Sequence, residues 1–495
     1  MYRTKPPTRG PLIGLLALPL ALGLVAACAA PSGTTVPAAS IRTATAEPSR
    51  PSDRTPVLID TDLGWEDVSA IAYLASRPDV DVRAVTVSGT GEVRCPAGAA
   101  VAHRVLAALD LGAVPVACGS SDAGLDGTPI PSAWRDTSDA GHHLDLPPVP
   151  AEADDAGTSG SAVELIRTTA RAAPGALRVV MLGPATNLAD AIAAEPAVAS
   201  MTHDVTAMGG AITAPGNVRG AGVADQNATA EWNVFADPSA WQAVLSSGIP
   251  LTVVPLDATD HVPVTRGLYL ALGVNRSTPA ARLVFDLLDR NPETFGPGES
   301  FWDSLTSMVA FEPSLASFQP VGLHVELAEG SERGRLIVDE HGVTVQAAMA
   351  ADGTAFRERF ISTLNGGAPV LPVGEPAATI QVTFDGRTCG ADLPTLALDS
   401  AVALTFENGA PYEVGAALVR LADGVTLADI ETAIATDPER AERLARPVVA
   451  TGAQPGSQAT ETAFLVQPGT YAIACFSYVG DQVQFYPAGS TVVAP

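Results

Sequence analysis

Between residues 56 and 366, short apolar runs alternate with segments whose apolar positions recur every three or four residues. The runs predict buried strands, and the recurrence on one face predicts amphipathic helices. We expect strands at 57–59, 82–88, 114–117, 177–181, 205–208, 251–255, 336–338 and 343–345. Helices are expected from residue 67 and at 97–109, 162–172, 188–194, 265–272, 281–290 and 356–364. This alternation favours an α/β fold with an open, mostly parallel sheet and helices on both faces.

The pattern changes after a stretch rich in Gly and Pro at 366–376. Beyond it, β patterns recur at 379–384, 401–407, 416–421, 462–466 and 469–477, with one helical pattern at 423–435. Short strands separated by turns predict a small all-β sandwich over residues 377–495. The chain of 495 residues is long enough for both domains.

The amino-terminal segment has the composition of an export signal. Arg3, Lys5 and Arg9 precede an uncharged apolar run over 12–27, which is shorter than the roughly 20 residues a membrane-spanning helix needs. The end of this run, Val25-Ala26-Ala27-Cys28, resembles a bacterial lipoprotein box, which implies cleavage of residues 1–27 and lipidation of Cys28. An ordinary secretory signal with an unmodified Cys is the alternative. Residues 28–55, rich in Pro, Ser, Thr and Ala, fit a flexible tether. We therefore expect a lipid-anchored protein on the extracytoplasmic face of a bacterial cell membrane.

Charge and cysteines narrow the partners and the compartment. The formal net charge is −26, which disfavours nucleic acid as a partner and is compatible with an uncharged small molecule. Outside the cytoplasm the four remaining cysteines can form disulfides. One pair in each domain gives Cys95–Cys118 and Cys389–Cys475, although spacing alone does not prove connectivity.

Acidic residues crowd the end of the first predicted strand. Asp60 and Asp62 follow the apolar run, and Glu66 and Asp67 begin the next helix after a turn at Gly64. Ligands of open α/β sheets bind at the carboxyl ends of the strands, and hard oxygen ligands suit Ca²⁺ or Mg²⁺. A helix dipole alone would explain Glu66 and Asp67 but not the other two acids. The stretch therefore predicts a cation site.

This stretch resembles the Asp-x-Asp-Pro-Gly-x-Asp-Asp signature of the inosine–uridine-preferring nucleoside hydrolases. Leu63 stands in place of the Pro, and Glu66 in place of the first Asp of the final pair. The Asp-x-Asp motif of haloacid-dehalogenase-like phosphatases fits less well, because it continues with Gly-Thr rather than Leu63 and Gly64. The resemblance covers about residues 56–366.

Further stretches resemble the same family in the same order. They are Leu-Gly-Pro-Ala-Thr-Asn at 182–187, Met-Gly-Gly-Ala at 208–211, Gly-Asn at 216–217, Ala-Glu-Trp-Asn at 230–233 and Asp303 near the end. The resemblance implies that Ca²⁺ is held by Asp62, Asp67, Asp303 and the carbonyl of Leu182, with Asp60 as a weaker ligand or support. It implies ribose contacts from Glu66, Met208, Asn217, Glu231 and Asn233, and an altered contact at Thr90, where the family has Asn.

The group that would protonate the departing base differs from the family pattern. Trp302 replaces the His that the family proposes as this acid, and an indole can stack on a base but cannot supply a proton. The long stretch 121–160 resembles the family's loop that brings a His over the substrate, and His142 and His143 both lie in it. Two solvent-exposed histidines on a surface loop are the alternative.

The resemblance implies Ca²⁺-dependent hydrolysis of the N-glycosidic bond of ribonucleosides or related N-ribosides, with Asp62 as the general base. The alternative is a binding lipoprotein that keeps the fold and ion without turnover, which the departures at Leu63, Glu66, Thr90 and Trp302 favour. Residues 471–476 resemble cupredoxin-like domains, but no His follows His341 and no Met follows Met349, which excludes a standard blue-copper site. That domain is expected to bind a cell-surface partner or only to pack.

Overall fold

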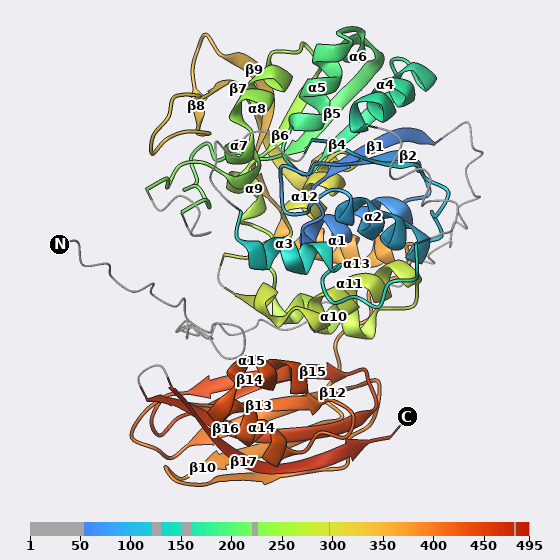
Figure 1. The fold of residues 1–495 in the computed structure, drawn as a ribbon. Helices are drawn as coiled ribbons and strands as arrows, with labels where there is room; N and C mark the ends of the chain where they lie inside the picture. Colours follow the sequence, from blue (N-terminus) through green and yellow to red (C-terminus); the bar gives the residue numbers. More distant parts are fainter. Residues whose placement is uncertain are drawn as a thin grey trace, which may run out of the picture. The chain divides into compact units, whose positions relative to one another are not determined.

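The computed structural model describes residues 54–494 except 121–129, 150–160, 220–225, 297 and 480–481. The predicted signal peptide and Cys28 lie outside the described residues. The chain divides into two compact units, one that runs to Val373 and one from Gly374 to Pro495. Figure 1 shows the first unit in blue to light orange and the second in orange to red.

The first unit is built on a nine-stranded sheet with the order β3-β2-β1-β4-β5-β6-β9-β7-β8. The strands from β3 to β9 in this order pair in parallel, and β7 pairs antiparallel with both β9 and β8. The strands are β1 Thr55–Thr61, β2 Val80–Val87, β3 Val116–Cys118, β4 Leu177–Met181, β5 Thr202–Met208, β6 Leu251–Val254, β7 Ala316–Val325, β8 Leu336–Val338 and β9 Val343–Ala351.

Two groups of helices cover the two faces of this sheet, because the strand order runs outward from β1 in one direction and from β4 in the other (Figure 1). One group is α1 Trp65–Ser76, α2 Ala97–Ala108, α11 Pro279–Arg290, α12 Trp302–Val309 and α13 Gly353–Leu364. The other is α4 Ala162–Ala172, α5 Thr186–Ala194, α6 Ala197–Met201 and α8 Pro238–Leu245. The remaining helices are α3 Ser132–Asp139, α7 Trp232–Ala236, α9 Leu256–Thr259 and α10 Arg266–Val274, with 3₁₀ turns Pro292–Phe295 and Pro313–Leu315. The predicted α/β fold is confirmed.

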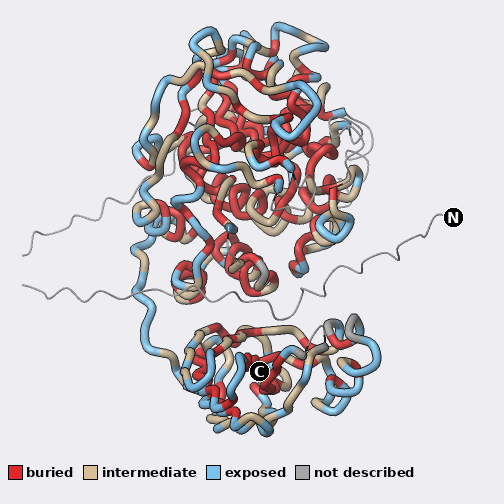
Figure 2. Tube along the Cα trace, turned by 90° about the vertical axis from the view of Figure 1, so that its left-hand side faces the viewer, coloured by how far each residue is buried: buried red, intermediate tan, exposed pale blue. Residues whose placement is uncertain are grey.

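The core follows from the apolar runs. Val57, Leu58 and Ile59 of β1 are fully buried, because the strand is central and covered on both faces. Figure 2 shows the same distribution along the chain, with buried segments concentrated inside the unit. This packing holds the carboxyl end of β1 rigidly.

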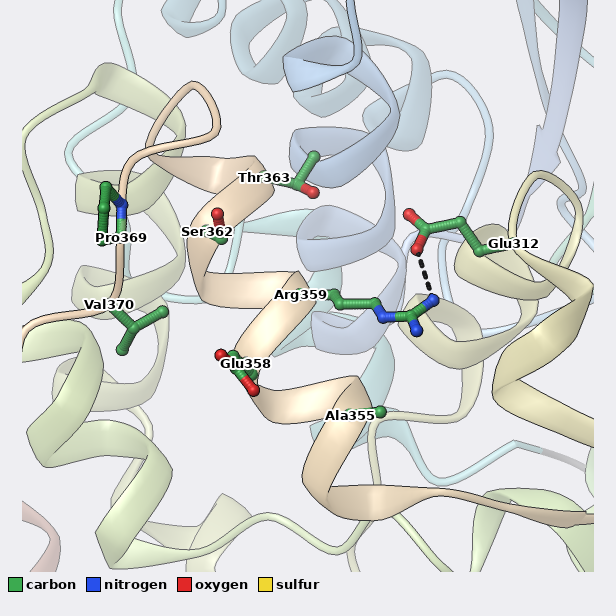
Figure 3. A pocket seen from close by; sticks show the side chains of 8 residues that line it. All are labelled: Glu312, Ala355, Glu358, Arg359, Ser362, Thr363, Pro369 and Val370. Atoms are coloured by element: carbon green, nitrogen blue, oxygen red, sulfur yellow. Dashed lines mark hydrogen bonds and ion pairs between the residues drawn. The ribbon is translucent and has the colours of Figure 1, made fainter. Parts of the chain in front are cut away.

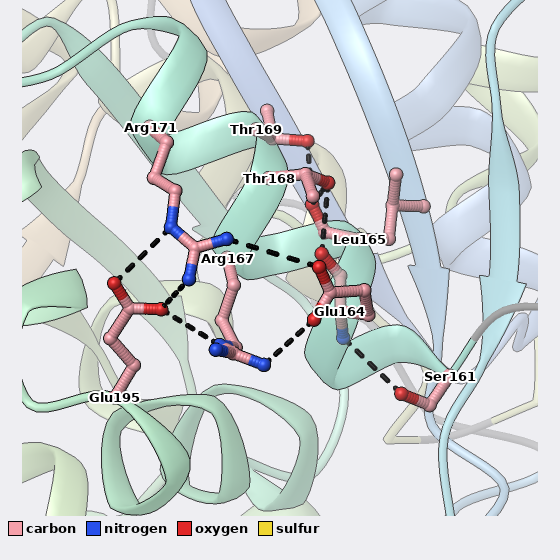
Figure 4. Close-up of polar contacts among 8 residues, drawn as sticks. All are labelled: Ser161, Glu164, Leu165, Arg167, Thr168, Thr169, Arg171 and Glu195. Carbon is pink, nitrogen blue, oxygen red and sulfur yellow. Dashed lines mark hydrogen bonds and ion pairs between the residues drawn. The ribbon is translucent and has the colours of Figure 1, made fainter.

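Polar contacts hold the start of α4 and join α4 to the end of α5. The Ser161 hydroxyl caps α4 by accepting from the Glu164 amide at 3.2 Å. Glu195, which ends α5, accepts from Arg171 and, at 2.8 Å, from Arg167 (Figure 4). Such exposed pairs contribute little individually, so burial provides most of the stability here.

The order of the strands reverses between β1 and β4. The chain leaves β1 toward β2 on one side, whereas β4 continues toward β5 on the other. The helices that follow the two strands therefore lie on opposite faces and leave a crevice at the strands' carboxyl ends, where α/β proteins bind ligands. The acidic stretch comes directly after β1 and Leu182 directly after β4.

The second unit consists of two four-stranded sheets, β11-β10-β12-β15 and β14-β13-β16-β17, which agrees with the predicted sandwich. Its elements are β10 Ala378–Phe384, β11 Cys389–Asp392, β12 Ser400–Asn408, β13 Val414–Leu421, α14 Leu427–Thr436, α15 Pro438–Leu444, β14 Ala445–Ala453, β15 Gln458–Leu465, β16 Gly469–Val479 and β17 Gln482–Val493. Cys389 of β11 forms a disulfide with Cys475 of β16, and Cys95 forms one with Cys118 in the first unit. Both pairs are the expected ones.

Several sequence expectations are wrong in detail. The stretch 121–160 is expected to be irregular, but residues 132–139 form helix α3. The helix expected at 423–435 begins at Leu427, because Thr426 caps it and closes a capping box with Asp429. Strands β7, β11, β14 and β17 are not predicted by the sequence pattern. Among the described residues, no helix combines the length and apolar character needed to cross a membrane.

Candidate active site

Asp60, the last residue but one of β1, is fully buried and held from both sides. Its Oδ1 accepts from the Thr86 hydroxyl of β2 at 2.6 Å and from Asn187 Nδ2 of α5 at 2.7 Å. Its Oδ2 has no hydrogen-bond donor among the described residues. Burial raises the pKa of the Asp60 carboxyl to about 7. Asp60 is thus well placed to support the neighbouring acids, with one oxygen left for a cation.

Asp62 lies in a crowded turn. Its Oδ2 accepts from the Glu92 amide at 3.0 Å, and a Cβ on Gly91 would lie only 2.0 Å from that oxygen. Burial and the nearby charges of Asp67 and Glu92 raise its pKa well above the ordinary value. Leu63 follows with φ 55°, a conformation closed to Pro, whose ring holds φ near −65°. The turn therefore takes a path that the Pro of the family signature could not take.

Three carboxylates converge where α1 and α12 meet. One carboxylate oxygen from each of Glu66, Asp67 and Asp303 lies within 4.8 Å of the other two. Asp67 and Asp303 are almost completely buried, and the Thr61 hydroxyl donates to Asp67 Oδ1. The two helices are tied beside this group by the Ser69 and Ser304 hydroxyls, 2.5 Å apart. We call Glu66, Asp67 and Asp303 the carboxylate triangle.

The triangle fits a hard divalent cation. Asp67 Oδ2 and Glu66 Oε2 are buried atoms without a donor among the described residues. Burial first, and then repulsion from neighbouring acids, raises the pKa of Glu66 and Asp303 well above the ordinary range. Buried like charges are stable together only when a cation or protons neutralise them, and oxygen donors of this kind suit Ca²⁺. Asp62 lies outside the triangle but close to Asp67.

The expected carbonyl ligand lies on the other side of the crevice. The Leu182 amide donates to the Asp60 carbonyl at 2.7 Å, and the Leu182 carbonyl accepts from Asn233 Nδ2 at 2.6 Å. A carbonyl oxygen has a second lone pair, so this bond leaves room for an ion. Asn233 Nδ2 also lies 3.4 Å from Met208 Sδ, which brings two expected ribose contacts together.

Glu231 is engaged mainly with the backbone. It caps α7 by accepting from the amides of Asn233 at 2.9 Å and Val234 at 3.3 Å, and it accepts from the Gly210 amide at 2.8 Å. Burial raises its pKa to about 7. Asn217 accepts from the Trp232 amide at 2.9 Å. Both residues thus shape the loop around β5 besides their expected ribose contacts.

Thr90 belongs to a chain of buried hydroxyls rather than pointing outward. Its Oγ1 lies 2.8 Å from Ser88 Oγ and 3.0 Å from Thr186 Oγ1, and Thr186 donates to Asp237 at 2.8 Å. Because the single hydrogen of Thr186 goes to Asp237, the Thr90 hydroxyl donates to Thr186 and accepts from Ser88, so its own hydrogen is already engaged. This supports the expectation that the family's ribose contact is altered here.

The two histidines of the predicted loop differ. His142 is buried with Nε2 2.8 Å from the Leu63 carbonyl, whereas His143 is exposed. Burial lowers the pKa of His142 to about 4, so at neutral pH its ring is uncharged and donates to Leu63. The structure thus places His142 beside the acidic turn, with its proton already engaged.

Helix α3 fastens the loop after β2. Arg135 Nη2 donates to the carbonyls of Gly89 at 2.6 Å and Gly91 at 3.1 Å, and the ring of Trp134 lies 5.7 Å from that of Trp232. Ser138 donates to Glu92 at 3.1 Å. This part of the predicted loop therefore buttresses the turn that contacts Asp62.

Sequence reasoning missed Glu92 and Trp65. Burial, and then the charge of Asp67, raises the pKa of Glu92 to about 7. The sequence could have indicated Glu92, because it lies two residues after Thr90. That position puts it at the same edge of the sheet as Asp60 and Asp62. Trp65 lies 6.3 Å from Trp302 between ring centres, and Trp302 packs against the cluster of Met208, Ala211 and Leu256. The two indoles thus form an aromatic wall next to the acids.

A cavity of about 400 Å³ lies elsewhere, along α13. Arg359 and Glu312 form an ion pair at 3.1 Å on its wall (Figure 3). Its lining residues are Glu312, Ala355, Glu358, Arg359, Ser362, Thr363, Pro369 and Val370, none of which belongs to the acidic group at the end of β1.

The first unit is thus a doubly wound α/β sheet with a group of buried carboxylates at its switch point. The profile of the inosine-uridine preferring nucleoside hydrolase family matches residues 57–358, and the chain belongs to this family of N-glycosyl hydrolases. The carboxyl-terminal unit lies beyond the matched residues.

Sequence relatives cover the same region. The chain is 28% identical over 316 residues to a pyrimidine-specific ribonucleoside hydrolase of Shewanella woodyi. The aligned region covers 60% of this chain and 91% of the relative. It is 30% identical over 293 residues to an uncharacterized protein of Schizosaccharomyces pombe, covering 57% of this chain and 88% of the relative.

Solved structures share the fold. A plant nucleoside hydrolase superimposes with a TM-score of 0.54 at 23% identity, covering 63% of this chain and 99% of its own. An inosine-uridine preferring nucleoside hydrolase from Bacillus anthracis gives 0.55 at 21% identity, covering 63% and 100%. A purine-preferring ribonucleoside hydrolase from Gardnerella vaginalis gives 0.53 at 25% identity, covering 63% and 98%.

Proposed function

We propose that the protein is a Ca²⁺-dependent hydrolase of ribonucleosides or related N-ribosides that acts at the outer face of a bacterial cell membrane. The observation that carries the ion dependence is the carboxylate triangle, with buried oxygens that lack donors, at the switch point of the sheet. Asp62 and the carbonyl of Leu182 lie at the same edge and complete the proposed ligand set, with Asp60 behind them.

A bound Ca²⁺ would supply a water of lowered pKa and would orient ribose hydroxyls. The protein's own groups perform the remaining work. Asp62 accepts the proton of the attacking water while that water forms a bond to C1′ and the bond from C1′ to the base nitrogen breaks. Asn233, Glu231, Asn217 and Met208 are the proposed contacts to the ribose. An oxocarbenium-like transition state is stabilised by the negative charge of the surrounding acids.

The departing base receives little help from side chains. Trp302 offers a face for stacking, and the proton of His142 is directed at the Leu63 carbonyl. Substrates whose base leaves readily are therefore the best fit. The same observation supports the second candidate, a nucleoside-binding protein without turnover.

The test is ribose release by the chain from residue 29 across a panel of nucleosides, with Ca²⁺ and with a chelator. Ca²⁺-dependent release that Asp62→Ala abolishes supports the hydrolase. Saturable nucleoside binding without release from any substrate would support the binding protein instead. In Asp62→Ala a hydrolase should lose turnover by orders of magnitude, whereas a binding protein should lose only the ion-dependent part of its affinity, because Asp62 is also a proposed ligand.

The anchor and the second unit are separate parts of the proposal. Lipidation at Cys28 is tested by detergent phase partition of the full chain and of Cys28→Ser, which should move to the aqueous phase. The second unit is proposed to bind a partner at the cell surface; in it Cys475 is in a disulfide and cannot ligate copper as a thiolate. A net charge of −26 supports the expectation that nucleic acid is not a partner.

A further inference from the structure

We infer that Glu66 is a direct ligand of the divalent cation in this protein rather than a contact to a ribose hydroxyl. The inference rests on the proposed cation site and deepens it, because it changes the ligand set and therefore the ions and sugars that the site accepts.

The position of the Glu66 carboxylate is the first argument. One of its oxygens lies within 4.8 Å of an oxygen of Asp67 and an oxygen of Asp303, and Oε2 is buried without a donor among the described residues. A Cβ on Gly64 would lie 2.9 Å from Glu66 Oε2 and 3.1 Å from Asp67 Oδ2. The two oxygens therefore approach the same small volume above Gly64, which only a residue without a side chain leaves open.

Side-chain length is the second argument. Glu66 and Asp67 are consecutive in the first turn of α1, so their Cα–Cβ bonds point about 100° apart around the helix axis. A short side chain at residue 66 would point away from the direction that Asp67 takes. The extra methylene of Glu adds about 1.5 Å of reach and lets the carboxylate turn back toward Asp67 and Asp303.

Charge is the third argument. A ribose hydroxyl has one hydrogen and can satisfy one carboxylate oxygen. It would not offset the repulsion of Glu66 from Asp67 and Asp303, whereas one divalent cation ligated by all three carboxylates attracts each of them and offsets two of their three charges. Three side-chain carboxylates on one ion, with Asp62 and the Leu182 carbonyl nearby, suit the high and irregular coordination of Ca²⁺ better than the octahedron of Mg²⁺.

The experiment measures ion binding without turnover. Tb³⁺ replaces Ca²⁺, its luminescence is sensitised by the aromatic wall of Trp65 and Trp302, and its decay in H₂O and D₂O counts the waters on the ion. The variants are Glu66→Gln, which keeps the shape and removes the charge, and Glu66→Asp, which keeps the charge and shortens the reach. Glu92→Gln is the matched control, since it removes a nearby buried charge from outside the triangle.

If Glu66 is a ligand, both Glu66→Gln and Glu66→Asp gain about one coordinated water, and Ca²⁺ competes for the site at least about tenfold more weakly than in the unmodified protein. Glu92→Gln weakens Ca²⁺ less and gains no water. Unchanged hydration in both Glu66 variants, with Ca²⁺ affinity no lower than in Glu92→Gln, would overturn the inference. Glu66 would then be assigned as a contact to a ribose hydroxyl.

The outcomes also separate this inference from the proposed function. An unmodified protein that binds Tb³⁺ with fewer waters than Glu66→Gln supports the ligand role even if no nucleoside is hydrolysed. An unmodified protein that does not bind Tb³⁺ or Ca²⁺ would overturn both. Nucleoside hydrolysis that persists in Glu66→Gln with unchanged hydration would overturn only the ligand role.

Discussion

Replacing Glu231 with Gln should remove a pH-dependent part of the stability of the first unit. Glu231 is almost completely buried at the start of α7 and accepts from the amides of Gly210, Asn233 and Val234. Burial outweighs these bonds and raises its pKa from 4.5 to about 7. Gln has nearly the same shape and does not titrate.

The sign follows from proton binding. Between pH 4.5 and 7 the folded protein holds a proton on Glu231 that the unfolded chain has released. The free energy of unfolding therefore falls as pH rises through this window and is level above it. A rise of the pKa from 4.5 to about 7 corresponds to about 3 kcal/mol, at 1.36 kcal/mol for each pH unit.

The assay is denaturant unfolding at pH 4.5 and pH 8, followed by tryptophan fluorescence. All five tryptophans lie in the first unit, so this signal reports on the unit that contains Glu231. The other buried carboxyls titrate in both proteins, and their contributions cancel in the difference. The stability of the unmodified protein minus that of Glu231→Gln should fall by about 3 kcal/mol from the lower pH to the higher.

A difference that stays constant, or that rises with pH, would refute this reasoning. It would show that the three amide donors hold Glu231 ionised in the fold and outweigh burial. Equal slopes of unfolding free energy against denaturant in the two proteins are the check that both unfold from the same structure.

The remaining predictions concern the ion, the turn and the departing base. Asp303→Asn should lose bound Ca²⁺ and reduce kcat/KM by about 100-fold or more, measured by metal analysis and ribose release; a full complement of Ca²⁺ would contradict the triangle. Gly91→Ala puts a Cβ 2.0 Å from an Asp62 oxygen and should lower kcat by about 100-fold. Gly267→Ala, exposed and without close neighbours, should stay within about twofold. Trp302→His should speed the release of unactivated bases by about tenfold or more, while 4-nitrophenyl riboside, whose leaving group needs no proton, changes little; an equal change for both would exclude a role for residue 302 in base departure.

Local sequence determined much of this protein because its signals are short-range. The acidic run after the first apolar strand, the turn at 182–187 and the stretch 230–233 are each recognised within a few residues. The acidic run and the turn at 182–187 directly follow apolar runs, so the pattern alone assigns them to the ends of strands. Parallel strands bring such ends to one edge of a sheet. The α/β fold and the sandwich followed from periodicity alone.

Tertiary structure decided what depends on side-chain direction and on contacts between distant segments. The path of the turn at Leu63, with positive φ, and the meeting of α1 with α12 direct Glu66 toward Asp303 instead of outward. Packing also chose between two adjacent histidines: it buried His142 against Leu63 and left His143 in solvent. Residues far apart in sequence meet only when the sheet is assembled, so the sequence supplies the acids while long-range packing decides which of them face the same ion.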